Sequence, residues 1–135
     1  MRTIRLLICA GYWGLLTVLL LAPNPSAAVG LGRFSTLPWG DIGIHFTAFT
    51  ILTLLVHGSR WPKGIGWPFL AVLLAYGIAT ESLQWFVPSR AVELLDYTEN
   101  ILGVAAGTEI YWLAHRLIQR RAAPTPVAES EPLKK

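Results

Sequence analysis

The sequence predicts an all-α fold: an integral membrane bundle of four transmembrane helices with both termini in the cytoplasm. Only 14% of the residues are charged and 53% are apolar, whereas about a quarter of the residues in a soluble domain carry charge. Four apolar stretches cover residues 4–22, 41–57, 66–87 and 96–118. The length of each stretch is close to that of a helix that crosses a bilayer, which needs about 20 residues. Prolines lie at or near the ends of these stretches, where a missing N–H is tolerated.

One transmembrane domain is expected over residues 1–120, followed by a cytoplasmic tail over residues 121–135. The tail mixes Ala, Pro, Glu and Lys without an apolar period, so we expect it to be disordered.

The positions of Lys and Arg predict the orientation. Of the eleven, only Arg33 and Arg90 lie in the connections after the first and third stretches. The other nine lie before or at the start of the first stretch, between the second and the third, or at the end of the fourth and beyond. Such a bias marks the cytoplasmic side. This predicts a multi-pass protein of a cytoplasmic membrane. The nine residues are Arg2, Arg5, Arg60, Lys63, Arg116, Arg120, Arg121, Lys134 and Lys135.

The first stretch has a second interpretation. Two arginines, an apolar run and the small residues Ser26, Ala27 and Ala28 also resemble a signal peptide with its cleavage site. The apolar run is longer than the usual core of about 7–15 residues, which favours a span. Cleavage would leave three spans and would not move the polar residues described next.

Seven polar residues map to the extracytoplasmic end of the expected bundle. A charge inside hydrocarbon is costly, so ionisable residues at such positions are candidates for function. At about 1.5 Å per residue, those deepest in the second, third and fourth stretches lie at a similar depth of about 5–10 Å. We therefore expect a functional polar cluster there. Its candidate members are Asp41, His45, Glu81, Gln84, Arg90, Asp96 and Asn100.

The fourth stretch indicates that this cluster faces the bundle interior. Asp96, Asn100, Gly103 and Gly107 follow the spacing i, i+4, i+7, i+11, which is one face of a helix. Gly103 and Gly107 form a small-xxx-small pair, which lets another helix approach closely. We expect both glycines to serve in helix packing.

Structural roles compete with functional ones for most of these residues. Asp41 and Asp96 could be N-caps at the start of their helices. His45, Gln84 and Asn100 could form interhelical hydrogen bonds worth about 0.6 kcal/mol each. Glu81 is harder to explain in this way, because a carboxylate about two turns deep in hydrocarbon needs a partner or a proton.

Three segments of the chain are similar to the motifs of VanZ-like membrane proteins. Residues 81–90, ESLQWFVPSR, match the pattern E-x-x-Q-x-[FYL]-x-P-x-R. Residues 96–107, DYTENILGVAAG, match D-x-x-x-N-x-x-G-x-x-x-G. Residues 41–45, DIGIH, followed by Phe49, resemble D-K-x-x-H-x-x-x-[YF], with Ile42 where the family commonly has Lys. The resemblance covers residues 41–107.

The resemblance implies a bacterial cytoplasmic-membrane protein connected with the cell envelope. The VanZ-like family includes proteins linked to low-level resistance to teicoplanin and related glycopeptides, and it supplies no reaction. The ligands it suggests are therefore an envelope lipid, such as a lipid-linked precursor, or a glycopeptide-related compound.

Three functions remain open at the level of sequence. A binding protein would use the cluster to bind a polar headgroup, with Arg90 in contact with the phosphate of that headgroup. An intramembrane enzyme on a lipid-linked substrate would use Glu81 and His45, the candidate catalytic residues, as general base and acid. A proton-coupled transporter is less favoured, because transport sites usually lie near the bilayer midplane.

The sequence favours no cofactor and no bound metal. Asp41, His45, Glu81 and Asp96 have the side chains of metal ligands, but their spacing follows no established metal-site pattern. The expected partners are membrane lipids, and the sequence leaves a homo-oligomer open. Nucleic-acid binding is not expected, because membrane topology accounts for the basic residues.

Overall fold

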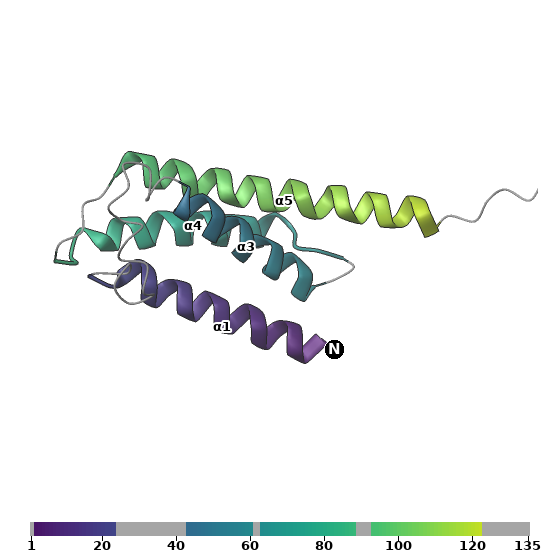
Figure 1. Ribbon diagram of the computed structural model, residues 1–135, viewed down its shortest axis with the longest axis horizontal. Helices are drawn as coiled ribbons and strands as arrows, with labels where there is room; N and C mark the ends of the chain where they lie inside the picture. Colours follow the sequence, from purple (N-terminus) through teal and green to yellow (C-terminus); the bar gives the residue numbers. More distant parts are fainter. Residues whose placement is uncertain (1, 24–42, 61–62, 89–92, 123–135) are drawn as a thin grey trace, which may run out of the picture.

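The structure, a computed structural model, describes residues 2–23, 43–60, 63–88 and 93–122. These residues contain four α-helices and no strands, which confirms the all-α class. Helix α1 spans Arg2–Leu21, α3 spans Ile44–Ser59, α4 spans Trp67–Gln84 and α5 spans Leu94–Ala122. Figure 1 shows the helices lying side by side along one long axis, with α5 extending beyond the others at its C-terminal end.

Each helix packs mainly against two neighbours. Both α3 and α4 pack against α1 on one side and α5 on the other. Across the bundle centre, the Phe49 ring of α3 lies 5.7 Å from the Tyr76 ring of α4. Helix α1 is fastened by two hydrogen bonds: Tyr12 donates to the Ala48 carbonyl at 3.0 Å, and the hydroxyls of Thr17 and Tyr76 lie 2.8 Å apart.

The closest helix contact joins α5 to α3 at the two glycines of α5. A Cβ atom on Gly103 would lie 2.6 Å from the Phe46 carbonyl oxygen, and one on Gly107 would lie 2.8 Å from that of Thr50. Real side chains do not come that close, so only glycine permits this approach. This contact determines how α5 is positioned along its axis relative to α3, and so which residues near the starts of the two helices lie side by side.

The helix bounds differ from the expected spans mainly at their ends. Helix α5 continues to Ala122, past the expected domain boundary, with Arg120 and Arg121 in its last turn. Cations there interact favourably with the helix dipole, and the polar end needs no membrane around it. The N-cap interpretation of Asp96 is wrong, because Asp96 lies inside the first turn of a helix that begins at Leu94. The residues expected to form a disordered tail, apart from Arg121 and Ala122, lie outside the described ones.

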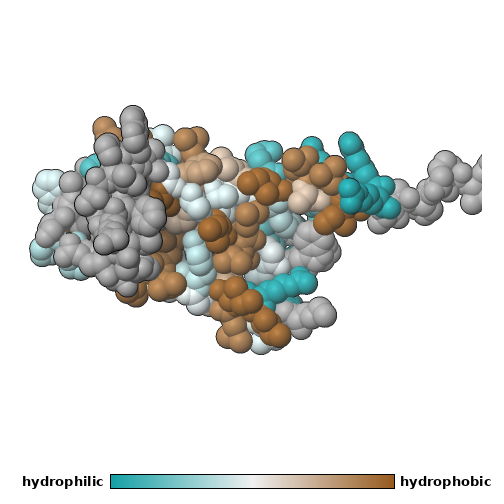
Figure 2. Space-filling view, viewed as in Figure 1, coloured by the Kyte–Doolittle hydropathy of each residue, from teal (hydrophilic) through white to brown (hydrophobic). Residues whose placement is uncertain are grey.

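Among the described residues, one helix has both the length and the hydropathy of a membrane span: Arg2–Leu21. Helix α3 is apolar but has only 16 residues. The surface of the bundle is nevertheless rich in apolar groups, since 24 large apolar side chains of the described residues are exposed. Figure 2 shows apolar surface along the helices and hydrophilic surface gathered at the end of α5.

Candidate functional site

Three helices bring one histidine and two carboxylates together at one end of the bundle. His45 is the second residue of α3, Glu81 lies in the last turn of α4, and Asp96 lies in the first turn of α5. His45 Nδ1 lies 4.0 Å from Glu81 Oε2, and His45 Nε2 lies 3.7 Å from Asp96 Oδ2. One potential ligand atom from each side chain lies within 4.8 Å of the other two.

Asn100 fixes the orientation of the His45 ring. The Asn100 amide donates to the Gly77 carbonyl oxygen at 3.1 Å, and Asn100 Oδ1 lies 3.2 Å from His45 Nδ1. Exchanging the amide oxygen and nitrogen would place two oxygens against each other at Gly77, so Oδ1 must face the ring. An amide oxygen only accepts hydrogen bonds. His45 Nδ1 therefore donates, and the lone pair of the neutral ring lies on Nε2, beside Asp96.

Glu81 and Gln84 occupy one face of the last turn of α4, and both are enclosed. Their exposed fractions are 0% and 1%. The Glu81 carboxylate accepts a hydrogen bond of 3.4 Å from the backbone N–H of Glu93. Neither polar atom of the Gln84 amide has a hydrogen-bond partner among the described residues. Because buried polar groups in native proteins are nearly always paired, this amide indicates a partner beyond them.

Glu99 is a buried residue of this region that the sequence analysis missed. Its carboxylate accepts hydrogen bonds from the backbone N–H groups of Gly43, at 2.8 Å, and Phe46, at 3.3 Å. These groups belong to the start of α3, whose N-cap residue, Gly43, supplies no side-chain cap. Glu99 thus caps α3 from α5 and fixes the position of His45. The only signal in the sequence was a carboxylate adjacent to Asn100 with no assigned role.

Two candidate residues, Asp41 and Arg90, lie outside the described residues. The structure therefore gives no position for the expected N-cap role of Asp41 or for the expected phosphate contact of Arg90. The other five members of the expected cluster all lie at the end of the bundle where α3 and α5 begin and α4 ends. They are His45, Glu81, Gln84, Asp96 and Asn100.

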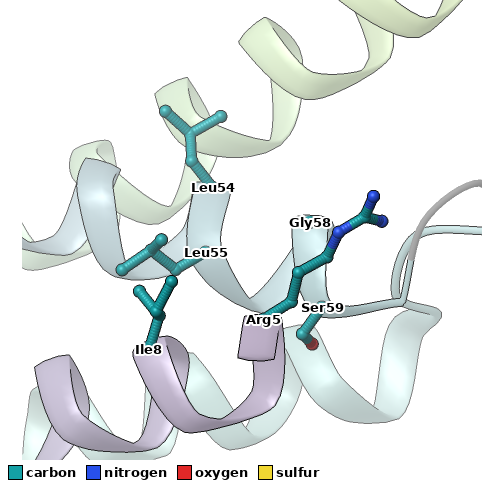
Figure 3. Close-up of a pocket in the computed structure, with 6 residues that line it drawn as sticks. All are labelled: Arg5, Ile8, Leu54, Leu55, Gly58 and Ser59. Carbon is teal, nitrogen blue, oxygen red and sulfur yellow. The ribbon is translucent and has the colours of Figure 1, made fainter. Parts of the chain in front are cut away.

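A separate cavity of about 270 Å³ lies between α1 and α3 at the opposite end of the bundle. Figure 3 shows Ile8 and Leu55 facing each other in this cavity, with Arg5 extending past Gly58 and Ser59. It contains no residue of the polar cluster. The candidate site is therefore a set of convergent side chains that is separate from this cavity.

The cluster offers two kinds of chemistry. A carboxylate and an imidazole at 4.0 Å can exchange protons with a ligand held between them. One imidazole and two carboxylates are also the donor types that bind divalent metal ions. No family model, curated protein or solved structure matches this chain, so both possibilities rest on the geometry alone.

Proposed function

We propose that this chain is a VanZ-like integral membrane protein of the bacterial cytoplasmic membrane that binds the polar headgroup of an envelope lipid. The binding site is the polar cluster at the extracytoplasmic end of a four-span bundle. A glycopeptide-related compound that carries similar polar groups would bind at the same place.

The distribution of polar and apolar side chains supports a membrane environment. Nine polar or charged residues are buried among the described ones, against ten hydrophobic residues. Water would favour a larger excess of apolar side chains inside and fewer large apolar side chains outside. In lipid an apolar exterior is favourable, and helices are joined by small residues and interhelical hydrogen bonds, such as those at Gly103 and Asn100.

Helix lengths are compatible with this proposal. At about 1.5 Å per residue, α1 is about 30 Å long, which matches the hydrocarbon core of a bilayer. Helix α3 is about 24 Å long and would span with local thinning or with polar residues at its ends. Helix α5 is about 44 Å long, so its charged last turns would lie in the cytoplasm.

The observation that carries the headgroup site is the burial of Glu81 within 4.0 Å of His45 at one end of the bundle. A fully enclosed carboxylate is costly unless it is compensated, and intramembrane ionisable residues of this kind mark functional sites. Gln84 adds a buried amide that a headgroup could pair.

The test measures thermal unfolding of detergent-purified protein with a panel of envelope lipids that share acyl chains and differ in headgroup. A ligand that binds the folded state raises the unfolding temperature. We expect one headgroup class to stabilise the wild type and to stabilise Glu81→Gln and Arg90→Ala much less. Glu109→Gln is the matched control, since Glu109 is exposed on α5. Equal stabilisation of all four proteins would refute the cluster as the binding site.

An enzyme on a lipid-linked substrate is the second candidate, favoured by the approach of Glu81 to His45. In that case purified protein would turn over the lipid that stabilises it, and Glu81→Gln would abolish turnover while Glu109→Gln would not. Activity that persists in Glu81→Gln would remove Glu81 from a catalytic role. A proton-coupled transporter is less favoured, because the cluster lies at one end of the bundle.

A further inference from the structure

The arrangement of His45, Glu81 and Asp96 has the features of a metal site assembled from three helices. Zinc binds imidazole nitrogen and carboxylate oxygen at about 2.0–2.2 Å, and its tetrahedral geometry places neighbouring ligand atoms about 3.3–3.6 Å apart. His45 Nε2 and Asp96 Oδ2 are already 3.7 Å apart. One ligand atom from each of the three residues lies within 4.8 Å of the other two, so side-chain rotations that shorten these distances would complete the site.

The hydrogen bonds that orient the His45 ring are a second observation that favours a metal site. A histidine that binds a metal through one ring nitrogen usually donates its other N–H to a fixed acceptor, which sets the tautomer and the ring orientation. Here His45 Nδ1 donates to Asn100, which is itself held by the Gly77 carbonyl oxygen. The chain leaves Nε2 with its lone pair on the side of Asp96.

Burial and charge favour a cation at this position. His45 and Glu81 are 8% and 0% exposed, and Asp96 is half-buried, so the position is enclosed but can be reached. A divalent cation would be attracted to two carboxyl groups that lie within 4.0 Å of one imidazole. The buried Gln84 amide, one turn from Glu81, has no hydrogen-bond partner among the described residues, and a water or ligand oxygen on a bound ion would provide one.

We propose that His45, Glu81 and Asp96 bind a divalent transition-metal ion, such as Zn²⁺, with Asn100 as the positioning residue. A mixed set of one imidazole and two carboxylates suits Zn²⁺ better than Mg²⁺ or Ca²⁺, which prefer oxygen ligands alone. Three protein ligands leave a coordination position open. A phosphate or carbonyl oxygen of a headgroup could occupy it. That use of the ion rests on the proposed function, whereas binding of the ion to the protein does not.

The test uses full-length protein freed of metal by a chelator, in detergent without added lipid. Zn²⁺ is titrated by calorimetry, and bound zinc is counted by elemental analysis. We expect one ion per chain, with affinity reduced by about tenfold or more in His45→Asn, Glu81→Gln and Asp96→Asn. Asn100→Leu should weaken binding by about 10–100-fold, as loss of an orienting partner does elsewhere.

Two variants control for general effects of the substitutions. His115→Asn and Glu109→Gln remove the same chemical groups from α5, away from the cluster, and should bind Zn²⁺ as the wild type does. Asp96→Asn keeps the shape of a half-buried side chain, so it tests the proposal even if Glu81→Gln fails to fold. Equal Zn²⁺ affinity of the wild type and Asp96→Asn, or no binding by the wild type, would overturn the metal site. Zinc binding without any lipid effect would support the metal site and count against the headgroup proposal alone.

Discussion

At the scale of single residues, the two buried histidines of α3 are held in opposite ways. His45 Nδ1 faces the carbonyl oxygen of the Asn100 side chain at 3.2 Å, so it must carry a proton. His57 Nδ1 accepts a hydrogen bond of 3.3 Å from the backbone N–H of Ile65, so it must be unprotonated. In their neutral forms the two rings are therefore opposite tautomers. This difference prepares His45 alone to offer Nε2 as an acceptor.

The tautomers provide a first prediction, measurable by NMR of protein labelled with ¹⁵N-histidine. When both rings are in their neutral form, we expect His45 with its proton on Nδ1 and His57 with its proton on Nε2. In Asn100→Leu the His45 signals should move towards a mixture of tautomers, while those of His57 should not change. Identical tautomers in the wild type would contradict the hydrogen-bond chain through Asn100.

A second prediction concerns Glu99, which is 6% exposed. In Glu99→Ala the part-buried backbone N–H groups of Gly43 and Phe46 lose their acceptor. A fully buried donor left unpaired costs about 1–3 kcal/mol, and these two donors cost less each because water can reach them in part. We expect a clear fall in the unfolding temperature, with a smaller fall for Glu99→Gln, which keeps one oxygen acceptor. Glu109→Ala, on the exposed face of the same helix, is the control. Equal unfolding temperatures for Glu99→Ala and this control would show that the cap contributes nothing.

At the scale of helices, the contact between α3 and α5 determines whether the cluster can form. His45 and Asn100 come from these two helices, and Gly103 lies one turn below Asn100 at the point of closest approach. Any side chain at Gly103 must push the backbones apart. The packing of one pair of helices is thus coupled to the geometry of the site.

The third prediction follows from this coupling. In Gly103→Ala the new Cβ would meet the Phe46 carbonyl oxygen at 2.6 Å, and overpacking of this kind costs about 1–3 kcal/mol. We expect a lower unfolding temperature together with weaker Zn²⁺ binding. Gly11→Ala is the control, because nothing lies within 4 Å of a Cβ there, and alanine is about 1 kcal/mol more favourable than glycine in a helix. A Gly103→Ala variant as stable as Gly11→Ala would refute the close contact.

Helix α1 supports a fourth prediction, on the choice between a span and a cleaved signal peptide. The hydrogen bond from Tyr12 to Ala48 and the contact of Thr17 with Tyr76 fasten α1 to α3 and α4. A segment with such specific partners is expected to remain in the mature protein. When these 135 residues are expressed in a bacterium, intact mass spectrometry of the purified product should therefore give 14.9 kDa. A mass reduced by the first 25 to 30 or so residues, the length of a signal peptide, would show cleavage.

At the scale of the whole molecule, the described residues bury an unusually large share of polar side chains. The described residues expose apolar side chains along the helices and bury an almost equal number of polar and hydrophobic ones. The site end and the basic end are also opposite ends of the bundle, since Arg120 and Arg121 lie in the last turn of α5 and Asp96 in its first. An oriented membrane protein has this polarity.

The fifth prediction tests that orientation with single cysteines in a Cys9→Ser background. Trp85→Cys lies at the site end, where the tryptophan is 76% exposed, and Arg120→Cys lies at the basic end. A membrane-impermeant maleimide should label the first in intact cells and the second only after permeabilisation. Labelling of both without permeabilisation would contradict the membrane proposal, and the reverse pattern would invert the orientation.

The sequence predicted the all-α class and the four helices that the described residues form, because each long apolar run has room for one helix. The packing order could not be predicted, since a periodic pattern gives the faces of a helix but not its neighbours. Glu99 was missed because its partners are backbone groups of another helix, which leave no trace in residue identity. The grouping of His45, Glu81 and Asp96 likewise has no spacing signal, because each residue comes from a different helix. Membrane insertion and the VanZ-like resemblance stay predictions.

The cap on α3 has a consequence for how the chain is made. A ribosome completes α3 some forty residues before it reaches Glu99. Until α5 is synthesised, the first N–H groups of α3 lack the carboxylate that accepts their hydrogen bonds. Helix α3 can therefore take its final position only after α5 has been synthesised. A nascent chain released before α5 is made would contain α1, α3 and α4 but would lack Glu99, the residue that positions His45.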